Sequence, residues 1–303
     1  MVGVIEGSTG MHRFFVDPAI LGGDRVALTG LQAHQIGRVL RLKPGDRVVL
    51  LDGTGREHVV QLDEVRSSAV TGTVEVVRPS RPEPGLVLTL YQALVPRDRF
   101  ETVLQKGTEV GIARFVPTWC ERSIVPGGER IDEKRLERWR RIVTEAAEQC
   151  ERGIVPEVTP PLRFQDALAQ AVATGPALIA WERERERSVQ DGLREAFTAD
   201  GRVLGLMVGP EGGFSSHEIP TAREAGALTI SLGPRILRTE TAGPILAALA
   251  LYEAGDLEPA PPTPLPLRIA LIGCDVVRRT IFAEPRPDIP PPQAGEGEQS
   301  ANV

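Results

Sequence analysis

Two short segments in the C-terminal half of the chain combine glycine with charged residues in a way that suits ligand binding. The first is Gly209-Pro210-Glu211-Gly212-Gly213, which continues as Phe-Ser and directly follows the apolar run VLGLMV. Its glycines permit positive φ angles and a close approach of the backbone to a ligand. The segment matches neither GxGxxG nor GxxxxGK[ST], which argues against a classical dinucleotide fold and a P-loop ATPase. A tight strand–helix turn without a ligand is the alternative interpretation.

The second segment is LGPRILRTET at residues 232–241, after the apolar run ALTISL. Arg238 and Glu240, with one further arginine, place charges between two apolar elements, and Thr239 or Thr241 could cap the helix that follows. A solvated turn with a local ion pair would also explain these charges. We favour a binding site, because ligands of open parallel sheets bind beyond the carboxyl ends of the strands, where the two segments would meet.

Strands and helices alternate in the prediction from residue 86 onward. Five apolar runs are typical of strands buried on both faces: residues 86–95, 112–120, 177–182, 203–209 and 227–233. Helices are expected between them, at residues 98–110, 133–150, 188–198, 216–225 and 241–254. The pairs Asp98/Glu101 and Ser215/Glu218 have the spacing of capping boxes at two of these helices. This alternation predicts an α/β fold with a parallel sheet covered by helices on both faces.

Residues 11–80 differ from the rest, because short β-branched runs alternate there with glycine-containing turns. Runs of this kind between residues 48 and 77 predict the strands of a small β-barrel. The segment LQAHQIGRVLRL before them predicts a helix with Leu31, Ile36 and Val39 among the residues on one face.

Proline-rich segments mark the expected domain boundaries. The stretch PSRPEPG is stiff and polar, and it places a linker at residues 81–85 between the barrel and an α/β domain at residues 86–257. Residues 258–303 are again rich in proline and cannot form a packed core, so they are expected to be an unstructured tail.

Charge is unevenly distributed along the chain. The net charge is −6, while 9 basic and 9 acidic side chains balance in residues 1–80, and 13 and 13 balance in residues 81–160. The acidity therefore lies in the second half, and a basic face for nucleic acid remains possible in the first. The run ERERER at residues 182–187 alternates in sign and predicts a charged surface loop.

Several classes of protein are disfavoured by what the sequence lacks. No stretch approaches the ~18 apolar residues of a membrane-spanning helix, and the first ten residues lack the features of a secretory signal. Three distant cysteines and four scattered histidines form no disulfide scaffold and no metal-binding motif. We therefore expect a cytoplasmic protein with no membrane segment and no metal.

Four motifs in the chain resemble the bacterial ribosomal small subunit methyltransferase E family. They are QKGTEVGIARFVPTWCERS at residues 105–123, KRLERWRRIVTEAAEQCERGIVPEV at 134–158, LMVGPEGGFSSHEI at 206–219 and SLGPRILRTETA at 231–242. The start MHRFFV at Met11 also resembles the beginning of family members, so residues 1–10 are expected to be an extension. The resemblance covers residues 11–257.

The resemblance implies an N3-methyltransferase of the knotted SPOUT class that acts on a uridine of 16S rRNA in the small ribosomal subunit. It implies a PUA-like RNA-binding barrel, a trefoil-knotted methyltransferase domain, and a homodimer with the catalytic pocket at the subunit interface. S-adenosylmethionine is the implied cofactor. By match to the family, the cofactor-binding residues are Gly209, Pro210, Glu211, Gly212, Gly213, Leu232, Gly233, Ile236, Leu237 and Arg238.

The implied reaction needs groups that act on the uridine. One group must remove the N3 proton, or the negative charge that spreads onto O2 and O4 must be stabilised. Glu240 and Arg238 are the candidate catalytic residues for these two tasks, and Glu211 is an alternative base. Glu240 could equally be a structural partner of Arg238.

Arginine and lysine side chains are the expected contacts to RNA phosphates. Lys134, Arg138 and Arg141 have the spacing of one helix side, opposite the apolar side, and a solvated face with surface ion pairs is the alternative. The full set of candidate RNA-binding residues is Arg13, Arg38, Arg41, Lys106, Arg122, Ser123, Lys134, Arg138 and Arg141.

Three other functions remain open at this point. They are a knotted methyltransferase with another RNA target, a non-catalytic RNA-binding factor in ribosome assembly, and an enzyme that acts on a small nucleotide. The intact GPEGG and LGPRILRTET segments argue against the second, and the separate barrel argues against the third.

Overall fold

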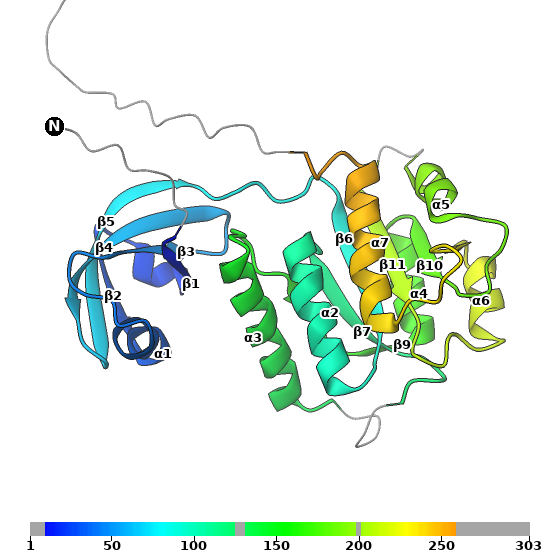
Figure 1. Cartoon of the computed structure of the whole chain (residues 1–303), viewed down its shortest axis with the longest axis horizontal. Coiled ribbons are helices and arrows are strands. Elements are labelled where there is room, and N and C mark those ends of the chain that lie inside the picture. Colours follow the sequence, from blue (N-terminus) through cyan, green and yellow to red (C-terminus); the bar gives the residue numbers. More distant parts are fainter. Residues whose placement is uncertain (1–9, 125–130, 198–200, 259–303) are drawn as a thin grey trace, which may run out of the picture. The chain divides into compact units, whose positions relative to one another are not determined.

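The computed structural model describes residues 10–124, 131–197 and 201–258 (Figure 1). The expected extension at residues 1–10 and the expected tail at residues 258–303 lie outside these ranges, apart from Gly10 and Glu258. A five-stranded sheet and a seven-stranded sheet organise the described residues. None of the helices in these ranges is long and apolar enough to cross a membrane.

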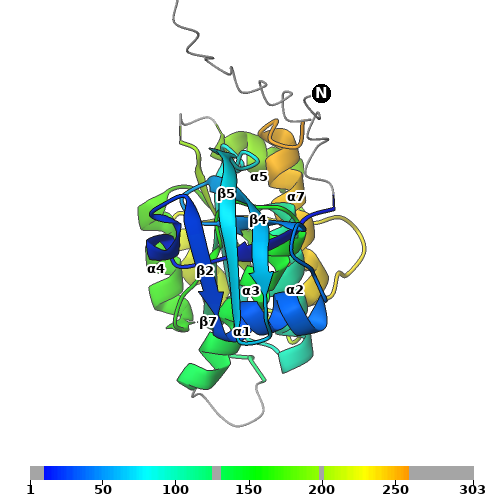
Figure 2. The same cartoon turned by 90° about the vertical axis from the view of Figure 1, so that its left-hand side faces the viewer.

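The first sheet has the strand order β1-β3-β4-β5-β2. Its elements are β1 (His12–Phe15), the 3-10 turn η1 (Pro18–Leu21), β2 (Arg25–Thr29), β3 (Arg47–Leu51), β4 (Arg56–Val65) and β5 (Ala69–Pro79). β1 runs parallel to β3 and the other pairs are antiparallel. Strands β2, β5 and β4 lie side by side (Figure 2). Alternate residues such as Leu28, Leu50 and Val60 point into one apolar cluster.

A short helical segment covers this cluster. Helix α1 (Gly30–His34) continues directly into a π-helical turn, η2 (Gln35–Val39). Ile36 is fully buried, whereas Leu31 and Val39 are 85% and 62% exposed. The predicted apolar face is therefore wrong for Leu31 and Val39, because the wider π-helical turn breaks the 3.6-residue repeat on which the prediction relied.

The second sheet has the order β12-β10-β11-β6-β7-β8, with β9 also beside β7, and all of its pairs are parallel. Its strands are β6 (Val87–Ala93), β7 (Arg114–Trp119), β8 (Glu157–Val158), β9 (Leu162–Arg163), β10 (Ala177–Ala180), β11 (Val203–Val208) and β12 (Leu228–Ile230). The predicted parallel sheet is confirmed. The trefoil knot that the family resemblance implies stays a prediction.

Helices cover both faces of the second sheet, as predicted. They are α2 (Arg97–Val110), α3 (Glu133–Gln149), α4 (Phe164–Thr174), α5 (Val189–Ala196), α6 (Glu218–Glu224) and α7 (Thr239–Glu253). On one face α3, α2 and α7 stand side by side (Figure 1), and Phe100, Trp139 and Leu246 from them pack with Leu90 of β6. On the other face, α4 and α6 pack against Met207 and its neighbours in β10 and β11.

The two expected capping boxes have different outcomes. Helix α2 begins at Arg97, one residue before the predicted cap, and Asp98 lies in its first turn. That prediction is wrong, because the carboxylate of Glu101 accepts from Arg97 and Arg138 instead of a backbone N–H. At α6 the reciprocal bonds are present: Ser215 N donates to Glu218 Oε2 (2.8 Å), and Glu218 N donates to Ser215 Oγ (3.3 Å).

Candidate functional site

One hydroxyl group joins the two predicted ligand-binding segments. Thr239 Oγ1 donates to the carbonyl oxygen of Gly209 over 2.7 Å, and it accepts from Gln92 Nε2 over 2.9 Å. Gln92 lies in β6 beside the end of β11, and its side chain is fully buried. The expected helix cap by Thr239 is therefore wrong: Arg238 holds the N-cap position without a side-chain bond, and the Thr239 hydroxyl is used across the sheet edge. The segments after β11 and β12 thus meet, as their positions predicted.

The glycine-rich segment after β11 is shaped by close side chains. Gly213 has a φ of +68°, and a Cβ there would lie 2.7 Å from Oε1 of Glu182. Arg122 lies against Gly212 and donates from Nη1 to the carbonyl oxygens of Gly212 (3.0 Å) and Phe214 (3.4 Å). Arg122 was expected to contact RNA, and in this structure its guanidinium holds the glycine-rich segment in place.

A buried carboxylate fixes the same segment to the turn after β7. Glu218 Oε1 accepts from Glu121 N (2.9 Å), while its Oε2 accepts from Ser215 N (2.8 Å). In that turn Ser123 Oγ accepts from Cys120 N over 3.2 Å. Ser123 therefore stabilises the turn that carries Arg122. This role is structural, and the expected contact of Ser123 with RNA stays a prediction.

The segment between β12 and α7 presents backbone and apolar groups. Gly233 has a φ of +100°, and open space surrounds the position of a Cβ there. Leu232 and Leu237 are half-buried against the sheet, whereas Ile236 is 84% exposed. Together with the segment from Gly209 to Gly213, these residues offer the unhindered backbone and apolar side chains that an adenosyl group requires.

The three candidate catalytic residues have different surroundings. The side chain of Arg238 is 81% exposed, and its Nη1 lies 3.9 Å from Oε1 of Glu240. The Glu240 side chain is only 16% exposed, and its Oε2 is buried without a hydrogen-bond partner in the described part of the chain. Glu211 is exposed and forms an ion pair with Arg99 in the first turn of α2. Of the three candidates, only Glu240 has a buried carboxylate oxygen without a partner in the described residues.

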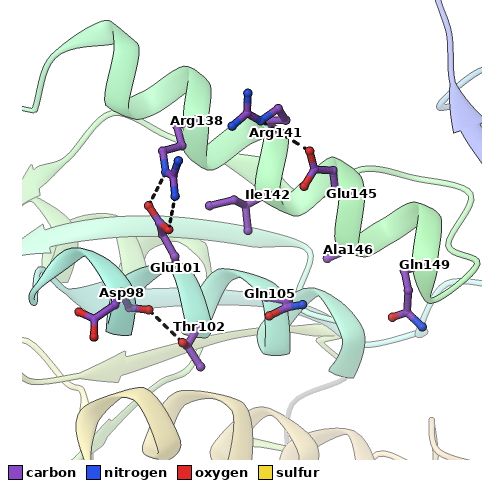
Figure 3. Close-up of a pocket in the computed structure, with 10 residues that line it drawn as sticks. All are labelled: Asp98, Glu101, Thr102, Gln105, Arg138, Arg141, Ile142, Glu145, Ala146 and Gln149. Carbon is purple, nitrogen blue, oxygen red and sulfur yellow. Dashed lines mark hydrogen bonds and ion pairs between the residues drawn. The ribbon is translucent and has the colours of Figure 1, made fainter. Parts of the chain in front are cut away.

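The arginine side of α3 is less uniform than the sequence suggested (Figure 3). Arg138 is bound by both oxygens of Glu101 on α2, over 2.6 and 2.8 Å. Arg141 pairs with Glu145 over 3.6 Å, while Lys134 is exposed near the start of the helix. The groove of about 460 Å³ between α2 and α3 is lined by both signs of charge and by none of the predicted cofactor-binding residues.

The remaining candidates for RNA contact separate into exposed and buried residues. Arg38 and Arg41 are exposed beside α1, and Lys106 is exposed on α2 with Glu109 as its partner. Arg13 is buried and its guanidinium forms an ion pair with Glu57, so RNA cannot reach it in this structure. The sequence alone could not show this, because Glu57 lies in another strand.

Two buried polar residues that hold segments in place were missed by reasoning from the sequence. Gln92 is a polar residue inside an apolar strand, and that isolated amide was the available signal. Glu184 belongs to the run expected to be a charged surface loop, yet it is buried and accepts from Arg223 Nη2 (2.8 Å) and from backbone N–H groups of its own loop. The prediction of a solvated loop is wrong at this position, because the carboxylate organises the loop from inside.

Comparisons with known proteins agree with this geometry. Residues 82–251 match a family model described as an RNA methyltransferase domain, and residues 28–75 match an RNA methyltransferase PUA domain. Ribosomal RNA small subunit methyltransferase E of Bacillus subtilis is 32% identical over 80% of this chain and 96% of its own length. The Synechocystis protein of the same name is 35% identical over 78% of this chain and 76% of its own length.

Solved structures give the same result. The crystal structure of ribosomal RNA small subunit methyltransferase E from Neisseria gonorrhoeae bound to S-adenosyl methionine has a TM-score of 0.72, with 32% identity over 80% of this chain and 98% of that one. A methyltransferase from Legionella pneumophila in complex with the same cofactor has a TM-score of 0.67, with 28% identity over 80% and 98%. The chain therefore belongs to the ribosomal RNA small subunit methyltransferase E family.

Proposed function

We propose that this protein transfers a methyl group from S-adenosylmethionine to N3 of a uridine in 16S rRNA of the small ribosomal subunit. The observation that carries the proposal is the bond between Thr239 and Gly209, which brings the two motif segments of the family together at one edge of the sheet. The names of the relatives and the cofactor in the two solved structures support it. The small ribosomal subunit as partner makes the cytoplasm the proposed location.

The residues of the two segments suit this cofactor. Backbone groups from Gly209 to Gly213 and from Leu232 to Arg238 would hold the adenosine and methionine parts, with glycine at Gly213 and Gly233 where φ is positive. When bound, S-adenosylmethionine supplies a methyl group already activated by its sulfonium. The protein is then left with two tasks, which are to orient the uridine and to manage its proton, and no metal is needed for them.

We propose that Glu240 is the base that accepts the proton from N3 of the uridine. Its Oε2 has no hydrogen-bond partner in the described residues, so this carboxylate keeps an acceptor for the N3 proton. Arg238 is exposed beside it, and its guanidinium would stabilise the negative charge on O2 or O4 of the uracil. Glu211 is the weaker candidate for the base, because its charge is already compensated by Arg99.

We also propose that two copies of the chain form the active unit. Ile245, Leu249 and Tyr252 recur along one side of α7 and are exposed, and Ile236 in the preceding segment is exposed as well. A stripe of this kind on a helix beside a ligand site is typical of a subunit interface. A second copy on this stripe would border the cofactor segments. In sedimentation experiments, Leu249→Glu is expected to give monomers where the unmodified protein gives dimers.

The predicted domain bounds complete the proposal. Residues 11–80 would hold RNA through the PUA-like domain, residues 81–85 would link it, and residues 86–257 would carry the reaction. The exposed Arg38 and Arg41 are the proposed RNA contacts of the first domain.

The test is methyl transfer from labelled S-adenosylmethionine to small ribosomal subunits from a strain that lacks this protein, with the nucleoside identified by mass spectrometry. Label in 3-methyluridine is the expected result. Cofactor binding without label in the subunits would contradict the substrate and favour another RNA target. Absence of both cofactor binding and label would contradict the enzyme and favour an assembly factor.

A further inference from the structure

A second cavity lies where the first turns of α2 and α3 come together. It has a volume of about 430 Å³ and is lined by Arg97, Asp132, Lys134, Arg135 and Arg138. Four of these five side chains are cationic, in contrast to the mixed groove further along the same helices. Cationic side chains around one cavity repel each other, and an anion bound between them would offset this repulsion.

The acidic groups nearby do not compensate these charges fully. Asp132 is the N-cap of α3, and its Oδ1 accepts from the backbone N–H of Arg135 over 2.9 Å. Glu101 is shared between Arg97 (3.0 Å) and Arg138 (2.6 Å). Among the described residues, Lys134 and Arg135 form no ion pair.

Arg135 is the most informative of these residues. Its Nε is buried and has no hydrogen-bond partner in the described residues. The guanidinium carbon lies 5.2 Å from the centroid of the Trp139 ring, which holds the group at a fixed place beside the cavity. Burial and the charge of Arg97 lower the pKa of Arg135. A planar guanidinium with free donors in such a place suits an oxyanion with two acceptors, such as phosphate.

The first turn of α2 connects the cavity to the proposed cofactor segments. Arg97 precedes Arg99 by two residues, and Arg99 forms an ion pair with Glu211 of the glycine-rich segment. The first turn of α2 therefore lies between the cavity and the cofactor site. An RNA strand whose target base enters that site would carry its neighbouring phosphates past this turn.

We propose that the cavity lined by Arg97, Lys134, Arg135 and Arg138 binds a phosphodiester group of the RNA substrate next to the methylated nucleotide. This inference rests on the proposed function, and it names how the same site holds its substrate. Arg135 donates to the phosphate from its Nη groups, and Lys134 adds a second cation from the solvent side. Arg97 and Arg138 keep the rim positive while Glu101 holds them in place.

The experiment uses the full chain with the variants Lys134→Gln, Arg135→Gln and both together. Arg140→Gln is the matched control, because Arg140 lies on the same helix, loses the same charge and does not line the cavity. Binding to small ribosomal subunits is measured between about 50 and 200 mM salt, together with the affinity for S-adenosylmethionine.

Each cavity variant is expected to weaken subunit binding about 10-fold at low salt, as the loss of a charged hydrogen bond does. The slope of log affinity against log salt should fall by about one for each lost phosphate contact. Cofactor affinity and the binding of Arg140→Gln should match the unmodified protein. Lys134 is exposed, so Lys134→Gln tests the inference even if Arg135→Gln does not fold.

The outcomes separate this inference from the proposed function. Cavity variants that bind subunits as Arg140→Gln does would overturn the phosphate site, even if the unmodified protein makes 3-methyluridine. Weaker binding by the cavity variants supports it, even if the unmodified protein methylates nothing. If inorganic phosphate stabilises the unmodified protein but not Arg135→Gln while subunit binding stays equal, the cavity binds a free anion and the inference is wrong.

Discussion

The hydroxyl of Thr239 lies 2.7 Å from the carbonyl oxygen of Gly209, and this hydrogen bond joins the two segments proposed to hold the cofactor. The same hydroxyl accepts from Gln92 Nε2, so the ends of β6 and β11 and the start of α7 are joined through one side chain. Gln92 is fully buried, and water cannot replace the bond there.

Thr239→Val should therefore weaken both the fold and the cofactor site. The change leaves the half-buried carbonyl oxygen of Gly209 and a buried N–H of Gln92 without this partner, which costs about 1–3 kcal/mol of unfolding free energy. We expect S-adenosylmethionine to bind about 10-fold more weakly by titration calorimetry. Thr241→Val is the control, because Thr241 makes no side-chain hydrogen bond among the described residues. Equal cofactor affinity in the two variants would contradict the role given to Thr239.

Glu240→Gln should affect the reaction and leave the cofactor bound. A general base contributes about 10²–10⁴ to the rate, so single-turnover methyl transfer should slow by at least about 10². Glu211→Gln is the matched comparison, and it should slow the reaction by less than about 10-fold because Glu211 is paired with Arg99. A larger loss in Glu211→Gln than in Glu240→Gln would move the assignment of the base to Glu211.

Glu184→Gln should destabilise the protein near neutral pH. Burial opposes the charged carboxylate, but hydrogen bonds from Thr229, the backbone of its own loop and Arg223 outweigh this and lower its pKa to about 2. The stability from this carboxylate is present above the ordinary pKa of 4.5 and is lost as pH falls toward about 2.

Urea unfolding tests this pH dependence. At about pH 7 the variant should lose about 1–3 kcal/mol, and the difference from the unmodified protein should shrink in acid. Glu186→Gln, a change at an exposed neighbour, should have little effect at either pH. A difference that stays constant down to about pH 3 would contradict the lowered pKa.

Glu148→Gln should stabilise the protein in alkaline solution. Burial raises the pKa of Glu148 to about 7, Glu145 adds to the shift, and the N–H of Phe15 opposes it. The folded protein therefore loses stability as pH rises from 4.5 through about 7, because the buried carboxyl must ionise. Glutamine keeps an acceptor for Phe15 N, which donates to Glu148 Oε1 over 2.9 Å.

Thermal unfolding at several pH values measures this effect. The variant should exceed the unmodified protein in Tm at about pH 8 and approach it at about pH 4.5. Glu137→Gln on the exposed side of α3 serves as the control. A gain in Tm that is the same at both pH values would show that the carboxyl of Glu148 does not titrate in this range.

The strands and helices of the large sheet could be predicted because the pattern of apolar residues along each one shows which side is buried. Apolar runs such as VLGLMV and the repeat of Leu136, Trp139 and Val143 are sufficient to place β11 and α3. The position of the glycine-rich segment could also be predicted, because glycine is needed where φ is positive, as at Gly213.

Contacts between distant segments could not be predicted in this way. Thr239 is a residue type that often caps helices, and only the fold shows that its hydroxyl donates to Gly209 instead. A glycine at position 107 is expected to lower the stability of helix α2, but a Cβ there would lie 2.7 Å from the ring of Phe115, so a larger residue would not fit. The sequence suggests that Arg13 contacts RNA, but β4 places Glu57 beside it and the two side chains form an ion pair. The partners of Thr239 and Arg13 lie 30 and 44 residues away in the sequence, and the partner of Gly107 lies on the strand that follows its helix.

The strand order has a consequence for the newly made chain. β12 joins the sheet beside β10, and α7 then returns to pack on α2 and β11. Thr239, which joins the two proposed cofactor segments through its bond to Gly209, belongs to this last described helix. During synthesis the contact between Thr239 and Gly209 therefore forms only after β12 and the start of α7 have been made, and contacts between such distant segments form slowly. A chain interrupted before Thr239 would therefore lack the hydrogen bond that joins the two proposed cofactor segments.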